Sequence, residues 1–143
     1  MEDFVPFELA KKLKEKGFRE KCYAYWCGGD NYHTLRYNFI QNPAPSRKLT
    51  IKDFNACENW YCERNCYDVP TISQVLKWLR DTKQIVFGTV PMQEMDGDYL
   101  GWCITIYKVD DNGYGLSWQE ELYYQTYESA ALAGIEYALD NLI

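Results

Sequence analysis

Histidine is almost absent from this chain, and long apolar runs are absent altogether. His33 is the only histidine among 143 residues, so a thiol enzyme would have to use it as the base for Cys22 or Cys27. Nothing that flanks these cysteines resembles a known nucleophile motif. No apolar run approaches the ~20 residues of a membrane-spanning helix, and we predict no membrane association.

Clustered basic residues and phosphate-binding loops are also missing. The chain has 21 acidic and 15 basic side chains, and its net charge is −6. Contact with a phosphate backbone needs clustered Lys and Arg, whereas the lysines of residues 11–16 share their surface with Glu8 and Glu15. The sequence holds no G-x-x-x-x-G-K-[ST], G-x-G-x-x-G or G-x-S-x-G motif. We therefore predict a protein that is not an enzyme, has no cofactor and binds no nucleic acid.

A secretory signal is not recognisable at the start of the sequence. The segment MEDFVPFELAKK has acids and then lysines where a basic region followed by an apolar region would be needed. We predict a cytoplasmic protein. Its six cysteines are then expected to stay mostly reduced, because disulfides are rare in that compartment.

Three of the cysteines crowd one stretch, NACENWYCERNCYD, at residues 55–68. Zinc ligation is one interpretation, but the spacing Cys57-x4-Cys62-x3-Cys66 departs from the C-x2-C knuckle that arranges thiolates tetrahedrally. In the other interpretation these residues are reduced, partly buried small hydrophobes. A small zinc-binding module that uses residues 57–66 is therefore the alternative function.

Aromatic side chains are abundant, with 13 tyrosines and five tryptophans. Tyrosine combines apolar area with a polar tip, which suits half-buried sheet surfaces and interfaces. If helices cover one face of a sheet, aromatic side chains on the other face need a cover. We therefore expect an accessory protein that acts through protein–protein contacts, with an unknown partner or as a homo-oligomer. The possible interface lies on the last hairpin and consists of Tyr114, Trp118, Tyr123 and Tyr124.

The clearest secondary-structure pattern covers the second half of the chain. A Thr71 cap and an apolar stripe predict a helix over 70–82, and capping at Thr126 predicts a closing helix over 126–143. Asn112-Gly113 predicts a hairpin turn. Strands are predicted over 84–90, 99–109 and 114–124. In the second of these strands, Trp102, Ile104 and Ile106 should share one side.

The first half of the chain is less regular. Residues 6–18 predict a short amphipathic helix closed by Gly17, and residues 22–27 predict a strand. No period is sustained from 28 to 69, which we expect to be a long irregular or weakly structured segment. We therefore predict a single α+β domain over 1–143. It should contain an antiparallel sheet of three to five strands, with two or three helices on one face, in α-β then α-β-β-β-α order.

Three strings resemble those of a known family: FELAKKLKEKGF, PTISQVLKWLR and TYESAALAGIEYALDNLI. The family consists of small uncharacterised proteins from anaerobic gut bacteria and their phages and mobile elements. It has no assigned activity, so the resemblance implies a genomic context and no mechanism. The cysteine-rich stretch is not part of it.

The α-β-β-β-α order also looks like a double-stranded RNA-binding domain. In that family, lysines at the start of the last helix grip the RNA phosphates. The matching positions here are Tyr127, Glu128, Ser129 and Ala130, with no lysine among them. The resemblance therefore implies a topology and does not extend to RNA binding.

Overall fold

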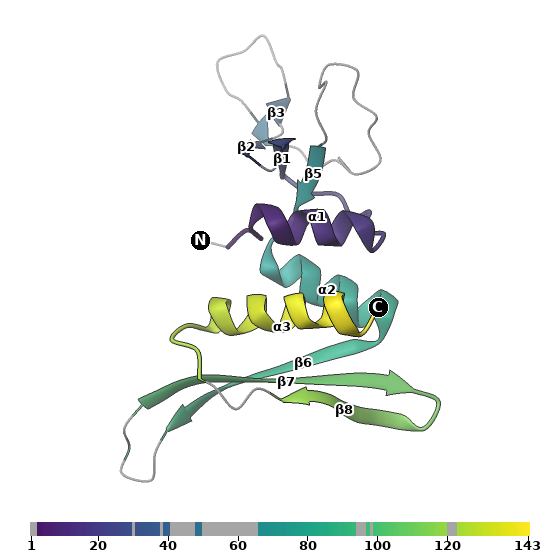
Figure 1. Cartoon of the computed structure of the whole chain (residues 1–143), viewed down its shortest axis with the longest axis vertical. Coiled ribbons are helices and arrows are strands. Elements are labelled where there is room, and N and C mark those ends of the chain that lie inside the picture. The colour runs from purple at the N-terminus through teal and green to yellow at the C-terminus, as the bar shows by residue number, and fades with distance from the viewer. Residues whose placement is uncertain are drawn as a thin grey trace. The chain divides into compact units, whose positions relative to one another are not determined.

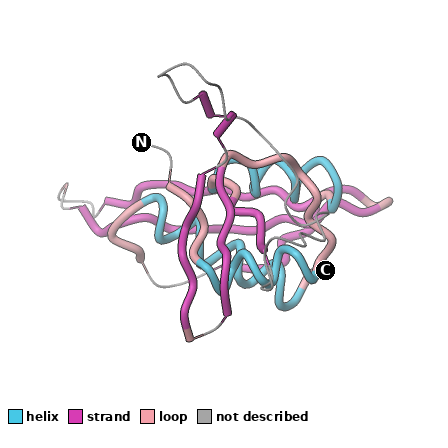
Figure 2. The backbone as a smooth tube through the Cα atoms, turned by 90° about the horizontal axis from the view of Figure 1, so that it is seen from above, coloured by secondary structure: helices cyan, strands magenta, loops and turns pink. Residues whose placement is uncertain are grey.

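The computed structural model describes residues 3–29, 31–37, 39–40, 48–49, 66–93, 97, 99–119 and 123–143. The chain divides into two compact units: an amino-terminal unit, Phe4–Thr71, and a carboxy-terminal unit, Ile72–Ile143 with Met1–Asp3. Each unit combines helix with antiparallel strands, so the predicted α+β class is confirmed. Most of the described backbone lies in helices and strands (Figure 2). That the whole chain is a single domain stays a prediction.

The amino-terminal unit contains one helix and a three-stranded antiparallel sheet. The helix is α1 (Phe7–Glu15), and the sheet has the order β2-β1-β5. These strands are β1 (Ala24–Gly29), β2 (Tyr32–Tyr37) and β5 (Cys66–Val69), and a second, two-stranded sheet pairs β3 (Phe39–Ile40) with β4 (Lys48–Leu49). Strands therefore occupy part of the range 28–69, for which we predicted an irregular segment. Residues 41–47 and 50–65 of that range lie outside the described residues.

Helix α1 lies within the predicted range 6–18. Pro6, which suits a first helical position, is instead the extended N-cap, with φ −70° and ψ 164°. Gly17 follows the helix with φ +86°, a left-handed conformation that glycine adopts without steric cost. The Phe18 N–H then donates to the Leu13 carbonyl at 2.9 Å, and both side chains are fully buried.

The single histidine lies in an aromatic cluster where α1 meets the sheet. The rings of Phe7 and His33 stack with centroids 3.8 Å apart and planes 4° from parallel. Trp26 meets both rings edge-on, with its centroid 5.1 Å from that of His33 and 6.1 Å from that of Phe7. Tyr67, opposite Trp26 in the register, meets Phe7 edge-on at 5.6 Å. Each such pair adds roughly 0.5–1.5 kcal/mol beyond area burial, so the cluster fixes α1 on the face that carries Trp26 and Tyr67.

The carboxy-terminal unit has the predicted α-β-β-β-α order. Its sheet is antiparallel in the order β6-β7-β8, and both helices lie on one side of it (Figure 1). The described residues form two three-stranded sheets, where we predicted one sheet of three to five strands. The elements of this unit are α2 (Ile72–Lys83), β6 (Ile85–Gln93), β7 (Tyr99–Asp110), β8 (Gly113–Gln119) and α3 (Tyr127–Asn141).

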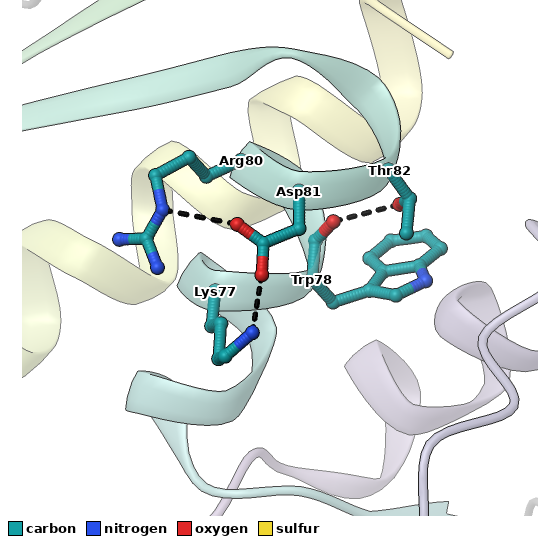
Figure 3. A network of polar contacts seen from close by, with 5 residues as sticks. All are labelled: Lys77, Trp78, Arg80, Asp81 and Thr82. Atoms are coloured by element: carbon teal, nitrogen blue, oxygen red, sulfur yellow. Dashed lines mark hydrogen bonds and ion pairs between the residues drawn. The ribbon is translucent and has the colours of Figure 1, made fainter.

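Helix α2 ends in a short polar network (Figure 3). Lys77 and Arg80 both bond to the Asp81 carboxylate, and the Thr82 hydroxyl donates to the Trp78 carbonyl at 2.7 Å. The hydrogen bond from Lys77 is the main cause of a lowered pKa of Asp81, and Arg80 adds to it. Gln84 follows with φ +55° and reverses the chain into β6.

The hairpin turn and the closing helix confirm two further predictions. The Asn112 N–H donates to the Asp110 carboxylate at 2.8 Å, and Gly113 takes φ +105°. Thr126 caps α3, because its hydroxyl accepts from the Ser129 N–H at 3.1 Å. The core of this unit then forms between α2, α3 and the facing side of the sheet, from Val75, Leu79, Ile85, Ile104, Ile106, Ala130, Ala131, Ile135, Ala138 and Leu139.

Candidate interaction surface

Successive side chains of the central strand β7 point to the two opposite faces of the carboxy-terminal sheet. Ile104 and Ile106 are fully buried beneath the helices, and the Trp102 ring meets Tyr127 of α3 edge-on at 5.7 Å. Lys108 continues the same side, since its Nζ donates to the Leu142 carbonyl at 3.0 Å. Alternate residues of a strand share a face, so the predicted grouping of Trp102, Ile104 and Ile106 is confirmed.

The opposite side of this sheet, which we name the open face, faces away from α2 and α3. No described element of the carboxy-terminal unit lies on it (Figure 1). None of its residues carries a charge, and Val90 is 53% exposed. Residues that stand opposite each other in an antiparallel register share a face. The open face therefore consists of Val86, Gly88, Val90 and Met92 of β6 and Gly101, Cys103, Thr105, Tyr107 and Val109 of β7.

Gly88 allows β7 side chains to lie across β6 at the centre of the open face. The Thr105 hydroxyl donates to the Gly88 carbonyl at 3.2 Å. A Cβ on Gly88 would lie 2.8 Å from that hydroxyl oxygen and 3.9 Å from Cε2 of Tyr107. The absence of a side chain at position 88 therefore makes room for both Thr105 and Tyr107.

Tyr123 borders the open face at its other end. The backbone of Tyr124 pairs with Trp102 through two hydrogen bonds of 2.7 and 2.9 Å. Gly101, with φ +128°, permits this approach, because a Cβ there would lie 2.6 Å from the Tyr124 carbonyl oxygen and 3.1 Å from Cβ of Tyr123. Since Gly101 is an open-face position, Tyr123 lies beside that face, and its side chain is 46% exposed.

The four predicted interface residues do not share one face. Trp118 stands opposite the buried Ile106 and stacks on Tyr137 of α3, with centroids 4.5 Å apart and planes at 14°, so it belongs to the helix side. Tyr124 stands opposite Trp102, also a helix-side residue. Tyr114 lies opposite Val109 in the register. Two of the four are therefore associated with the open face: Tyr123 through its approach to Gly101, and Tyr114 through its register position opposite Val109.

Sequence reasoning missed the β6 half of the open face. The signal was present in QIVFGTVPMQ, where Val86, Gly88, Val90 and Met92 recur at every second position. Whether any of these residues binds a partner stays a prediction, as it does for Tyr114, Trp118, Tyr123 and Tyr124.

Pro91 shapes the outer edge of β6. It pairs with Trp102, whose backbone N–H and carbonyl both bond to Tyr124 on the other side of β7. Pro91 therefore lies at a non-hydrogen-bonded position, and the N–H that proline lacks would have pointed out of the sheet. A missing donor discourages strand addition at this edge of the sheet.

The cysteine stretch is only partly within the described residues. Cys57 and Cys62 lie outside them, and Cys66 is the first residue of β5, directly opposite Cys27 of β1. Among the described residues no three His, Cys, Asp or Glu side chains gather as metal ligands. His33 pairs with Gly28 and Cys27 with Thr34, so the imidazole and the Cys27 thiol lie on opposite faces. This geometry gives no support to a Cys27–His33 catalytic pair, and zinc binding by residues 57–66 stays a prediction.

Within the part of the chain that the structure describes, every helix is too short or too polar to cross a membrane. Comparisons with protein-family models, curated proteins and solved structures find no match to this chain. The resemblance to small proteins of gut bacteria and their mobile elements therefore stays a prediction.

Proposed function

We propose that this protein is a non-enzymatic cytoplasmic accessory protein, and that it docks a partner protein or a second copy of itself on the open face. One observation carries the proposal: an uncharged, largely apolar sheet face that no described element of its own unit covers. Val90, which is 53% exposed, would gain from a cover, because burying apolar area contributes roughly 25 cal/mol per Å². A genomic context in phages or mobile elements is consistent with an accessory role.

Charge favours a protein partner over a nucleic acid. The chain has a net charge of −6, and none of the open-face residues is cationic. A phosphate backbone would find no counter-charge there, whereas an apolar protein surface would meet no unpaired charge. The same absence of charge lets two copies of an acidic chain meet without like-charge repulsion across the contact.

A charge placed on the open face tests the proposal. In the Val90→Lys variant, the lysine stays exposed to solvent in the isolated chain. In the complex, its ammonium group would be buried against the partner. Complex formation should weaken at least about tenfold, or about 1.4 kcal/mol, because burying an unpaired charge is costly. Sedimentation velocity measures self-association, and titration with the purified partner measures binding to another protein.

The matched control is Tyr32→Lys, which also puts a lysine at an exposed apolar position but lies on β2 of the amino-terminal unit, where Tyr32 is 67% exposed. We expect this variant to associate like the wild type. Equal association of all three proteins would contradict the proposal.

A further inference from the structure

Cys27 and Cys66 form the last described pair of the ladder that joins β1 to β5. The register runs from Ala24 opposite Val69 to Cys27 opposite Cys66. Directly opposite residues of antiparallel strands project to the same face, so the two thiols are neighbours. Both are largely buried, with exposed fractions of 9% for Cys27 and 5% for Cys66, and neither is in a disulfide.

Antiparallel geometry brings this pair within disulfide range. Opposite Cα atoms lie about 5.5 Å apart at hydrogen-bonded positions and about 4.5 Å apart at non-hydrogen-bonded positions. Disulfides join Cα atoms roughly 4.4–6.8 Å apart, so both kinds of position meet the Cα requirement.

We propose that Cys27 and Cys66 are a thiol–disulfide couple, oxidised by a small-molecule disulfide of the glutathione class. The Cys27 thiolate, the more exposed of the two, attacks one sulfur of the small disulfide, forms a mixed disulfide and releases one small thiol. The Cys66 thiolate then attacks the Cys27 sulfur, forms the Cys27–Cys66 bond and releases the second small thiol. Two protein thiols are oxidised by two electrons in total, and one small disulfide is reduced to two thiols.

Formation of this bond links β1 covalently to β5 and closes the loop between residues 27 and 66. Loop closure removes entropy from the unfolded chain, so the oxidised protein should be more stable than the reduced protein. For a loop and chain of this size, we expect the thermal midpoint of unfolding to rise by roughly 10 °C.

The test maps disulfides after equilibration with oxidised and reduced glutathione, by acid quenching, alkylation, digestion and mass spectrometry. The samples are the wild type, the Cys57→Ser/Cys62→Ser variant and the control Cys103→Ser, each in native buffer and in concentrated urea. In native buffer, the Cys27–Cys66 peptide should exceed every other cysteine pair at least tenfold in all three proteins. In urea the preference should disappear, because it depends on the β1–β5 register.

Three results would overturn the proposal. The first is a native preference for Cys66 joined to Cys62 or Cys57. The second is the absence of the Cys27–Cys66 peptide even in the Cys57→Ser/Cys62→Ser variant. The third is near-stoichiometric zinc in the purified wild type, with Cys27 and Cys66 protected from oxidation until a chelator removes the metal.

Discussion

Gly134 of α3 controls how closely that helix approaches the sheet. Replacing it with alanine changes the free energy of unfolding in two opposite ways, through helix propensity and through steric overlap. A Cβ at this position would overlap Cδ1 of Ile104 and lie 3.1 Å from Cε2 of Phe87. In a helix interior, alanine is favoured over glycine by roughly 0.5–1 kcal/mol. Forcing an extra carbon into a packed core costs roughly 1–3 kcal/mol. Because the steric cost exceeds the gain in helix propensity, we expect Gly134→Ala to lower the free energy of unfolding by roughly 1–2 kcal/mol.

A double-mutant cycle isolates the steric effect. Ile104→Val removes the Cδ1 atom that the new Cβ would overlap, and alone it should cost roughly 0.5–1.5 kcal/mol. The double variant should be more stable than the sum of the single effects predicts, with a coupling energy of roughly 1–2 kcal/mol. Urea denaturation followed by circular dichroism measures all four proteins.

Gly115→Ala is the control, because a Cβ there would meet its nearest neighbour, the Lys108 carbonyl oxygen, at an ordinary 3.8 Å. Its effect should be much smaller than that of Gly134→Ala. If Gly134→Ala instead stabilised the protein by the helix-propensity amount, α3 would not press on Ile104. The distinction between a helix-covered face and an open face would then fail.

Two further predictions concern the end of α2. Gln84→Gly should raise the free energy of unfolding by roughly 0.5–1 kcal/mol, because glycine adopts φ +55° without the steric cost that glutamine bears, and urea denaturation would show this as a higher midpoint at unchanged slope. Lys77→Gln should raise the pKa of Asp81 toward its ordinary value, because the hydrogen bond from Lys77 is the main cause of the lowered pKa. Carboxyl NMR titration checks this shift, and Lys83→Gln, on the same helix, should leave the pKa where it is in the wild type.

The sequence predicted the carboxy-terminal unit well because its signals are local. Asn112-Gly113 determines a turn through its own backbone preferences, and Thr126 caps the residues that follow it directly. The alternation of Trp102, Ile104 and Ile106 is likewise contained in one strand. Each of these predictions needs only a few neighbouring residues, so no knowledge of the fold was required.

The division of the strands into two three-stranded sheets could not be predicted, because β5 pairs with a strand that is distant in the sequence. β5 is a short strand that pairs with β1, and its Asp68 does not favour a strand by itself. Its extended conformation follows from pairing with Ala24–Cys27, which no local pattern reveals. The irregular segment predicted over 28–69 reflects the distant partner of β5, whereas β2 pairs with β1, its neighbour in the sequence.

A register shift between β7 and β8 decides on which side of the sheet Trp118 lies. Leu116 and Trp118 are two positions apart, which in a regular strand places them on one face. In the structure they stand opposite Tyr107 and Ile106, which are adjacent residues of β7, because the register shifts between them. A bulge of this kind has no reliable sequence signal, so the alternation could not predict which side of the sheet carries Trp118.

The central claim is that the open face contacts another protein, and site-specific photo-crosslinking tests it most directly. A benzophenone amino acid would replace Val90 in one protein and Tyr32 in the control, and both would be irradiated pure and in host lysate. We predict one discrete adduct at position 90, either with a second copy of the chain or with one identified protein, and none at position 32. No discrete adduct at position 90, or the same adducts at both positions, would contradict the claim.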